Sequence, residues 1–187
     1  MNIKFSFPGL NNIICVFGTR PGGQSQGPYA ANNISLEVGD DPQNVLANRK
    51  KLKQELGLNK WIELKQIHGL DIHFDLDEEN LQEIKNEGDG LATQKKGTGL
   101  VIKTADCQPI FLAHKSGRFI AALHCGWRGN RADFPVIGVQ KFCAHYHISP
   151  AEVLAVRGPS LGPCCAEFLD FNQHWPQEFA RYFNPEN

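Results

Sequence analysis

Apolar and polar residues alternate along this chain in short runs that predict a mixture of strands and helices. Apolar runs of strand length, rich in β-branched and aromatic residues, occupy residues 13–17, 61–67, 100–102, 110–113, 119–123 and 153–156. Apolar positions recur at helical spacing over residues 42–56, 135–146 and 175–183. Residues 77–87 are acidic and polar, and we expect a solvated helix or loop there. A length of 187 residues without an internal repeat or low-complexity linker predicts a single domain, 1–187.

The first expected helix carries signals for both of its ends. Asp41 is a favourable cap, Pro42 suits the first turn, and Gly57 suits the position just beyond the last turn. Three apolar residues fall on one stripe of this helix: Val45, Leu52 and Leu56. We therefore expect it to be structural.

A polar turn at residues 115–118 separates two of the expected strands and sets their register. If Ser116 and Gly117 form a two-residue hairpin turn, position 109 faces position 124. Cys107 and His124 then project from one face as diagonal neighbours, at a spacing that suits side chains converging on one ion. A three-residue loop would place them on opposite faces, and Pro109 is able to interrupt the ladder.

Composition narrows the classes of ligand. The formal net charge is −1, from 19 basic and 20 acidic residues, so no bulk charge favours nucleic acid or an anionic membrane. A small neutral or mildly anionic ligand fits better. No apolar run has the length needed to span a bilayer, and residues 1–7 lack the layout of a signal peptide, so we expect a cytoplasmic protein. The six cysteines are expected to be reduced thiols.

Candidate chemistry lies in three stretches beside Gly or Pro, at residues 66–69, 104–107 and 124–129. They supply His68, Cys107 and His124. Two imidazoles and a thiolate are the ligands zinc takes in an open catalytic site, with a fourth position left for water or substrate. The same side chains also suit a metal-free pair of nucleophile and base, Cys107 and His124. In either case Asp106 is expected to be an orienting or loop-bracing residue.

Two arginines are candidates for binding an anion. Arg128 follows His124 in a Trp-Arg-Gly turn, where a guanidinium can clamp phosphate or carboxylate, or can instead stack on Trp127 for structure alone. Arg20 lies in the Gly/Pro loop at residues 18–23, which is either a plain connection or a cradle of backbone N–H groups.

The order of these motifs closely resembles the YfiH-type laccase-domain proteins, which have been called multicopper polyphenol oxidases. The resemblance runs from about the first strand to Cys165. It rests on motifs in the same order: Gly18-Thr19-Arg20-x-Gly22-Gly23, Val38-Gly39-Asp40-Asp41-Pro42, Asn48-Arg49, Gln66-Ile67-His68-Gly69, Gly88-Asp89-Gly90, Thr104-Ala105-Asp106-Cys107-x-Pro109, His124-x-Gly126-Trp127-Arg128-Gly129 and Gly158-Pro159-x-x-Gly162-Pro163-Cys164-Cys165.

The resemblance implies an α+β fold of layered mixed sheets flanked by helices, related to cysteine-dependent hydrolases. It implies a zinc ion at His68, Cys107 and His124, and purine nucleoside chemistry. Members are described as phosphorolysing adenosine, inosine, guanosine and methylthioadenosine, and as deaminating adenosine. Phosphate would be held by Arg20 and Arg128. The nucleoside would meet two polar positions near the first loop: Ser25 and Asn33.

Three alternatives remain beside a zinc-dependent purine nucleoside phosphorylase. One is a metal-free Cys-His hydrolase or deamidase. A second is a copper-dependent polyphenol oxidase, which needs several histidine-rich copper sites where this chain offers one cluster. The third is a non-catalytic, truncated homologue, because most members continue well beyond the Pro-Cys-Cys motif. We expect no nucleic-acid or membrane partner, and the oligomeric state is open.

Overall fold

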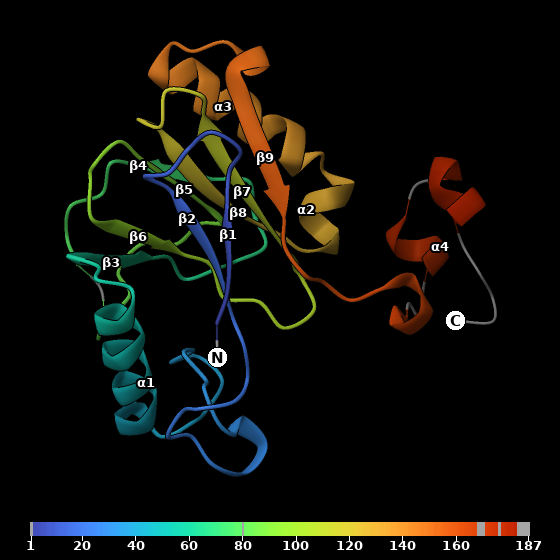
Figure 1. The fold of residues 1–187 in the computed structure, drawn as a ribbon. Helices are drawn as coiled ribbons and strands as arrows, with labels where there is room; N and C mark the ends of the chain where they lie inside the picture. The colour runs from blue at the N-terminus through green and yellow to red at the C-terminus, as the bar shows by residue number, and fades with distance from the viewer. Residues whose placement is uncertain (1, 80, 168–170, 176, 183–187) are drawn as a thin grey trace.

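The centre of the protein is a five-stranded sheet with the order β4-β5-β8-β7-β9 (Figure 1). This computed structural model describes residues 2–79, 81–167, 171–175 and 177–182. The β4–β5 pair is parallel, and the other neighbours are antiparallel. The strands of this sheet are β4 (Ile72–Phe74), β5 (Gly90–Thr93), β7 (Gln108–His114), β8 (Ile120–Cys125) and β9 (Val153–Arg157).

Two smaller sheets accompany the central one. The antiparallel hairpin consists of β1 (Asn2–Ser6) and β2 (Ile14–Gly18), and the parallel pair consists of β3 (Lys60–Glu63) and β6 (Thr98–Val101). The α-helices are α1 (Pro42–Glu55), α2 (Trp127–Arg131), α3 (Phe134–Tyr146) and α4 (Phe171–His174). Short 3-10 helices are η1 (Gly27–Tyr29), η2 (Pro150–Glu152), η3 (Pro163–Cys165) and η4 (Gln177–Tyr182). The expected α+β fold of mixed sheets and helices is confirmed.

The two faces of the central sheet are covered by different elements, because side chains alternate along each strand. On one face, Ile110 and Leu112 of β7 pack in a core cluster with Phe134 and Phe142 of α3. On the other face, Ala113 packs in a cluster with residues of the β1–β2 hairpin and the turn between its strands. Figure 1 shows α3 beside β9 and the hairpin crossing the sheet, with α1 below them. The central sheet is therefore packed on both faces.

A buried ion pair ties α1 to β3. Arg49 and Glu63 are 0% exposed, and the Arg49 Nη2 lies 2.7 Å from Glu63 Oε1. The other carboxylate oxygen accepts a hydrogen bond from Trp61 Nε1 at 2.7 Å, while the remaining guanidinium donors bond to the carbonyls of Ile34 and Leu81. The helix, the strand and two loops are therefore joined at one charged centre.

Several predicted elements are confirmed. Asp41 caps α1 by accepting from the Gln43 N–H at 2.8 Å, and Gly57 has φ +62° just beyond the helix. The strand expected over 61–67 is shorter, because β3 ends at Glu63 and the chain turns away. The strands β1, β4 and β5 were not predicted, because each is short and lacks a continuous apolar run. Residues 177–182 form 3-10 turns instead of part of an α-helix over 175–183, and residues 176 and 183 lie outside the described residues.

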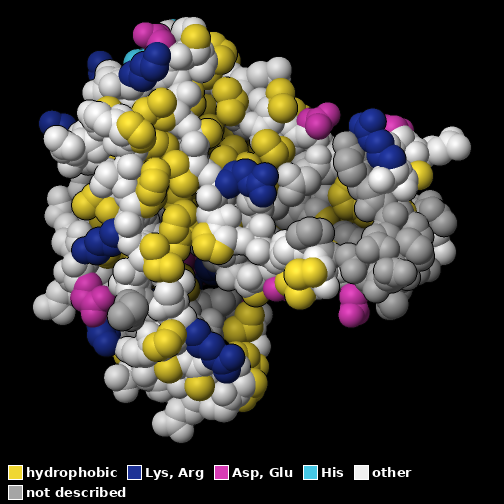
Figure 2. Space-filling model, turned by 45° about the vertical axis from the view of Figure 1, so that its right-hand side comes forward, with side chains coloured by type: hydrophobic (Ala, Val, Ile, Leu, Met, Phe, Trp, Pro, Cys, Tyr) yellow, Lys and Arg dark blue, Asp and Glu magenta, His cyan; other side chains and the backbone are white. Residues whose placement is uncertain are grey.

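The face of the protein drawn in Figure 2 is mainly uncharged. Figure 2 shows hydrophobic side chains in a band on the face it presents, with Lys and Arg scattered among them. Exposed apolar residues of the β1–β2 hairpin include Ile3, Phe5 and Ile14. Among the helices of the described residues, none has the length and apolar character needed to cross a bilayer.

Candidate metal centre

His68, Cys107 and His124 converge, and we call them the His-Cys-His cluster. One ligand atom from each lies within 4.8 Å of the other two. The Cys107 Sγ is 3.8 Å from His68 Nε2, and the two imidazole ring centres are 4.9 Å apart with an angle of 75° between their planes. His68 is exposed, Cys107 is half-buried and His124 is buried. The cluster therefore has one open side and a closed base.

The hairpin register brings two of these residues together as predicted. Pro109 pairs with His124, and the Gly117 N–H bonds to the His114 carbonyl at 2.8 Å across a tight turn. Gly117 has φ +68°, a conformation that glycine adopts without strain. Cys107 stands just before β7, which begins at residue 108, instead of within a continuing strand. The predicted register, with position 109 facing position 124, is confirmed, but the connection is longer than the expected two-residue turn, because β7 ends at His114 and β8 begins at Ile120.

His68 comes from the loop that follows β3, and its backbone has the unusual φ of +60°. The backbone N–H groups of Ile67, His68 and Gly69 all donate to the carboxylate of Asp89, at 3.2, 3.0 and 2.6 Å. A run of successive N–H groups around one anion is a nest, and here it holds the loop in its turned conformation. The strained backbone of His68 is therefore held by the carboxylate of Asp89, the residue just before β5.

Asp89 also holds His124. The Nδ1 of His124 lies 2.7 Å from Asp89 Oδ1, and the backbone N–H of His124 bonds to the Asp89 carbonyl at 2.7 Å. Burial acts to raise the pKa of the Asp89 carboxyl, but hydrogen bonds from His124, Gly69 and Ile67 outweigh burial and lower that pKa. Asp89 is consequently ionised and accepts every one of these hydrogen bonds.

Gly126 borders the cluster closely. A Cβ atom at this position would lie 2.9 Å from Cys107 Sγ and 2.9 Å from His68 Cδ2. Contacts of that length do not occur between such atoms without displacement, so any larger residue would push the thiol and the imidazole away. Glycine is thus required at position 126 of the His124–Gly129 motif for a steric reason.

The electrostatic surroundings favour neutral side chains in the cluster. Burial, the neighbouring His124 and the positive Arg128 lower the pKa of His68, although Asp89 opposes them. Burial, Asp106 and Asp89 raise the pKa of the Cys107 thiol, and Arg128 partly opposes this. A neutral imidazole is ready to bind a metal, whereas a protonated thiol needs a cation to displace its proton.

Asp106 was predicted to be an orienting or loop-bracing residue, and the structure shows which contacts it makes. Its side chain is exposed, and its backbone carbonyl accepts from the Leu161 N–H at 3.0 Å, which braces the loop before β7. The hydrogen bond that orients His124 comes from Asp89 instead. Sequence reasoning missed Asp89 as a site residue, although an acid between two glycines in a motif near apolar strands is a signal that points to it.

Gln66 joins the two loops that carry His68 and Cys107. Its Nε2 donates to the Lys103 carbonyl at 2.8 Å, and its Oε1 accepts from the Lys103 N–H at 2.8 Å. The side-chain amide thereby pairs with the backbone of Lys103 in the way that a neighbouring β-strand would. This contact was also missed from sequence.

We expect Gln66→Ala to loosen the cluster while leaving the fold intact. Loss of two hydrogen bonds should cost about 1–3 kcal/mol of unfolding free energy and weaken metal binding, because the two loops are no longer fixed to each other. Urea unfolding and zinc titration measure the two effects. Gln94→Ala, which removes an exposed amide bonded to Asp75, is the control and should leave metal affinity unchanged. Equal affinities for wild type and Gln66→Ala would contradict this role.

Of the four residues predicted to bind phosphate or nucleoside, Arg128 is the one that acts on the cluster. Its charge influences the pKa of both His68 and Cys107, and its Cζ lies 4.2 Å from the centre of the Trp127 ring. The structure therefore shows the stacked arrangement of Arg128, and its role as an anion clamp stays a prediction.

Arg20, Ser25 and Asn33 belong to a separate polar network. The Arg20 Nε donates to the Ala30 carbonyl, Ser25 Oγ accepts from Asn48 Nδ2 at 3.0 Å, and Asn33 Nδ2 donates to Asp40 Oδ2 at 2.9 Å. Within the described residues, none of their hydrogen bonds reaches the His-Cys-His cluster. The structure thus places these three residues beside α1 and does not join them to the cluster.

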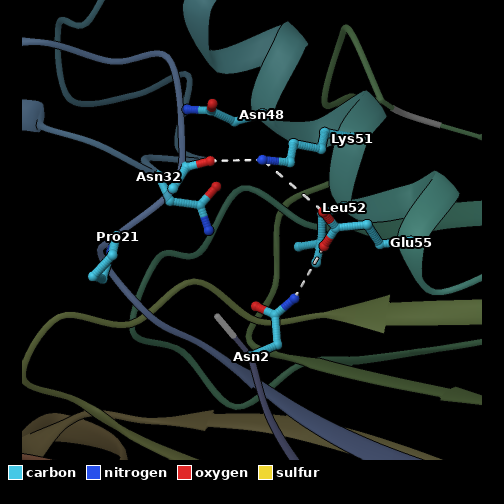
Figure 3. Close-up of a pocket in the computed structure, with 8 residues that line it drawn as sticks. Asn2, Pro21, Asn32, Asn48, Lys51, Leu52 and Glu55 are labelled. Atoms are coloured by element: carbon cyan, nitrogen blue, oxygen red, sulfur yellow. Dashed lines mark hydrogen bonds and ion pairs between the residues drawn. The ribbon is translucent and has the colours of Figure 1, made fainter.

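A polar pocket adjoins this network. Figure 3 shows Lys51 and Glu55 of α1 facing Asn2 and the loop that follows β2. The Lys51 Nζ bonds to the Gly22 carbonyl at 2.8 Å, which holds the loop against the helix. The pocket is lined by Asn2, Pro21, Gly22, Asn32, Asn48, Lys51, Leu52 and Glu55. Its lining includes no member of the cluster.

Comparison with known proteins gives consistent matches. Purine nucleoside phosphorylase YlmD of Geobacillus stearothermophilus is 34% identical over 171 residues, covering 87% of this chain and 62% of that protein. Purine nucleoside phosphorylase YfiH of Escherichia coli is 31% identical over 158 residues, covering 84% of this chain and 62% of that protein. The chain therefore spans about three fifths of the length of these relatives.

Solved structures agree with the sequence matches. The crystal structure of YlmD from Geobacillus stearothermophilus superposes with a TM-score of 0.80 at 33% identity, covering 86% of this chain and 62% of that one. The Bacillus licheniformis protein YfiH gives a TM-score of 0.74 at 29% identity, covering 82% and 60%. The family model described as multi-copper polyphenol oxidoreductase laccase matches residues 14–187. The chain belongs to this YfiH-type laccase-domain family.

Proposed function

We propose that the protein acts as a zinc-dependent purine nucleoside phosphorylase, with adenosine, inosine, guanosine and methylthioadenosine as substrates and a secondary adenosine deaminase activity. The observation that carries the proposal is the convergence of His68, Cys107 and His124 beside Arg128. Relatives named purine nucleoside phosphorylase support the reaction class.

The donor set fits zinc. Two imidazole nitrogens and one thiolate sulfur are a common ligand set for a catalytic zinc, which keeps a fourth position for water or substrate. Copper also accepts imidazole and thiolate ligands, so metal analysis identifies the ion. When bound, zinc would supply Lewis-acid chemistry. The chain's own contribution is to hold three ligands on two loops and strand β8, and to lower the pKa of His68.

Arg128 is the residue best placed to hold phosphate. Phosphorolysis requires phosphate to be held next to the sugar carbon that loses the base, and a guanidinium offers paired donors to phosphate oxygens. Arg20, Ser25 and Asn33 remain proposals for substrate binding, on a loop that sits beside α1. Their role requires the substrate to extend from the cluster to that loop.

The proposal is tested by incubating the purified chain with each nucleoside and phosphate. We expect release of the free base together with ribose 1-phosphate, or with 5-methylthioribose 1-phosphate when methylthioadenosine is the substrate, and inosine from adenosine without added phosphate. About one zinc per chain with none of these products contradicts the proposed activity. Ligand binding without turnover would instead identify a non-catalytic homologue.

The alternative of a metal-free Cys-His hydrolase has one observation in its favour. The Cys107 thiol lies 3.8 Å from His68 Nε2, within hydrogen-bond reach of that imidazole, where the sequence had suggested His124 as base. The raised pKa of Cys107 argues against a free thiolate. Absence of metal together with selective alkylation of Cys107 would favour the hydrolase.

Arg128→Ala is expected to raise KM for phosphate by about 10- to 100-fold, because a charge-assisted hydrogen bond contributes about 1.5–3 kcal/mol. Arg128→Lys should restore part of the loss, since lysine keeps the charge but not the paired donors. Phosphate dependence of base release measures the effect. Arg131→Ala removes another charge from α2 and serves as the control. An unchanged KM for phosphate in Arg128→Ala would rule out this residue as the clamp.

A further inference from the structure

The Asp89 carboxylate links two ligands that come from different parts of the chain. It is 0% exposed and accepts from the N–H groups of Ile67, His68 and Gly69 and from His124 Nδ1. The first three donors belong to the loop after β3, and the fourth belongs to β8. We propose that Asp89 is the positioning residue of the metal centre, fixing the orientation of both imidazoles at once.

Asp89 holds the backbone of His68 in an unusual conformation. Its φ of +60° is costly for a residue other than glycine, and such conformations persist where surrounding contacts hold them. The contacts here are the three N–H groups that surround Asp89. Without that carboxylate, the loop has no partner for these donors and the backbone of His68 can relax. Asp89 therefore fixes the direction in which the His68 ring leaves the chain.

Asp89 also bears on the tautomer of His124. Three backbone N–H groups already donate to the Asp89 carboxylate, so we assign the donor role to His124 Nδ1, which lies 2.7 Å from Oδ1. Protonation of Nδ1 leaves Nε2 with a free lone pair, which is the form needed by a metal ligand. Carboxylates that bond to the second nitrogen of a ligating histidine fix its tautomer and orientation. Asp89 performs this task while it also holds the other histidine.

An amide cannot replace the carboxylate. Asparagine at position 89 would offer one acceptor oxygen to donors that now share two, and its NH₂ group would face N–H groups. The ion-pair partner of Asp89 within the described residues is His124, so no lysine or arginine would compensate. The role thus depends on an acceptor-only group with two oxygens.

The inference rests on the proposed metal site but not on the nucleoside reaction, and its test is metal binding. We expect Asp89→Asn to lower the zinc affinity of the full chain by about 10- to 100-fold, measured by competition with a chromophoric chelator. If wild type binds no zinc, the proposed function fails. If wild type and Asp89→Asn bind zinc equally, the role of Asp89 fails while the metal site stands.

A matched control separates positioning from folding. Asp75 also carries a carboxylate with several hydrogen bonds, from Gln94, Thr93 and Tyr146, and it lies outside the His-Cys-His cluster. Asp75→Asn should lower stability without changing zinc affinity. A loss of affinity equal to that of Asp89→Asn would attribute the effect to general destabilisation.

A second readout does not require the variant to fold. In metal-free wild type labelled with ¹⁵N-histidine, the two ring nitrogens of His124 should show a protonated Nδ1 and an unprotonated Nε2. The opposite tautomer would overturn the proposal.

Restored zinc affinity in Asp89→Glu, compared with Asp89→Asn, would support the requirement for a carboxylate.

Discussion

Cys107→Ala is expected to abolish stoichiometric metal binding and to reduce nucleoside phosphorolysis by at least about 100-fold. The thiol is one of three ligand atoms within 4.8 Å of one another, and an alanine leaves two imidazoles, which hold zinc much more weakly. Metal ions contribute several kcal/mol to stabilising developing charge, and each 1.36 kcal/mol corresponds to about a factor of ten in rate. Elemental analysis and the base-release assay measure both losses.

Cys125→Ala is the matched control. Cys125 follows His124 in β8, so its side chain points to the opposite face, into the core cluster with Phe134. Burial raises the pKa of its thiol to about 12, so it stays protonated and does not compete for the metal. Zinc content and turnover should be unchanged in this variant. Retention of both by Cys107→Ala would exclude the metal centre, and loss of turnover alone, with zinc kept, would point to a nucleophilic thiol.

Arg49→Leu is expected to cause the largest loss of stability, about 3–5 kcal/mol. The substitution leaves the Glu63 carboxylate buried without its partner at 2.7 Å, and it removes the donors to the Ile34 and Leu81 carbonyls. Lys103 Nζ lies 3.6 Å from Glu63 and provides only part of the compensation. Urea unfolding monitored by tryptophan fluorescence measures the change, and one of the three indoles, Trp61, bonds to the same carboxylate.

Two comparisons make this result specific. Lys65→Ala breaks an exposed pair with Glu87, 2.7 Å apart, and should change the unfolding free energy by at most about 1 kcal/mol. The double variant Arg49→Leu with Glu63→Leu should be more stable than the sum of the single losses predicts, because neither charge remains unpaired. Strict additivity would show that the two charges do not interact.

Local signals in the sequence determined several features. The cap at Asp41 and the glycine at position 57 give the bounds of α1 within about a residue, because each satisfies backbone groups next to it in the chain. The polar turn at 115–118 sets the β7–β8 register, so Pro109 faces His124 as expected. In these cases the deciding contacts join residues close in sequence or follow from one turn.

The tertiary structure decided the rest of the candidate site. The sequence singled out His68 by its motif, but its place beside Cys107 depends on a carboxylate 21 residues away and on the Gln66 amide bonded to Lys103. No local pattern encodes such long-range hydrogen bonds, because their geometry arises only when separate strands pack.

The arginines illustrate the same division. From sequence, Arg20 and Arg128 were equal candidates for phosphate. The fold places Arg128 where its charge acts on the cluster, and it bonds Arg20 to the Ala30 carbonyl within its own loop. The sequence alone thus determined which side chains have the required chemistry. Their mutual distances, and so the electrostatic coupling that falls off with distance, were decided by the packing of the strands and loops that carry them.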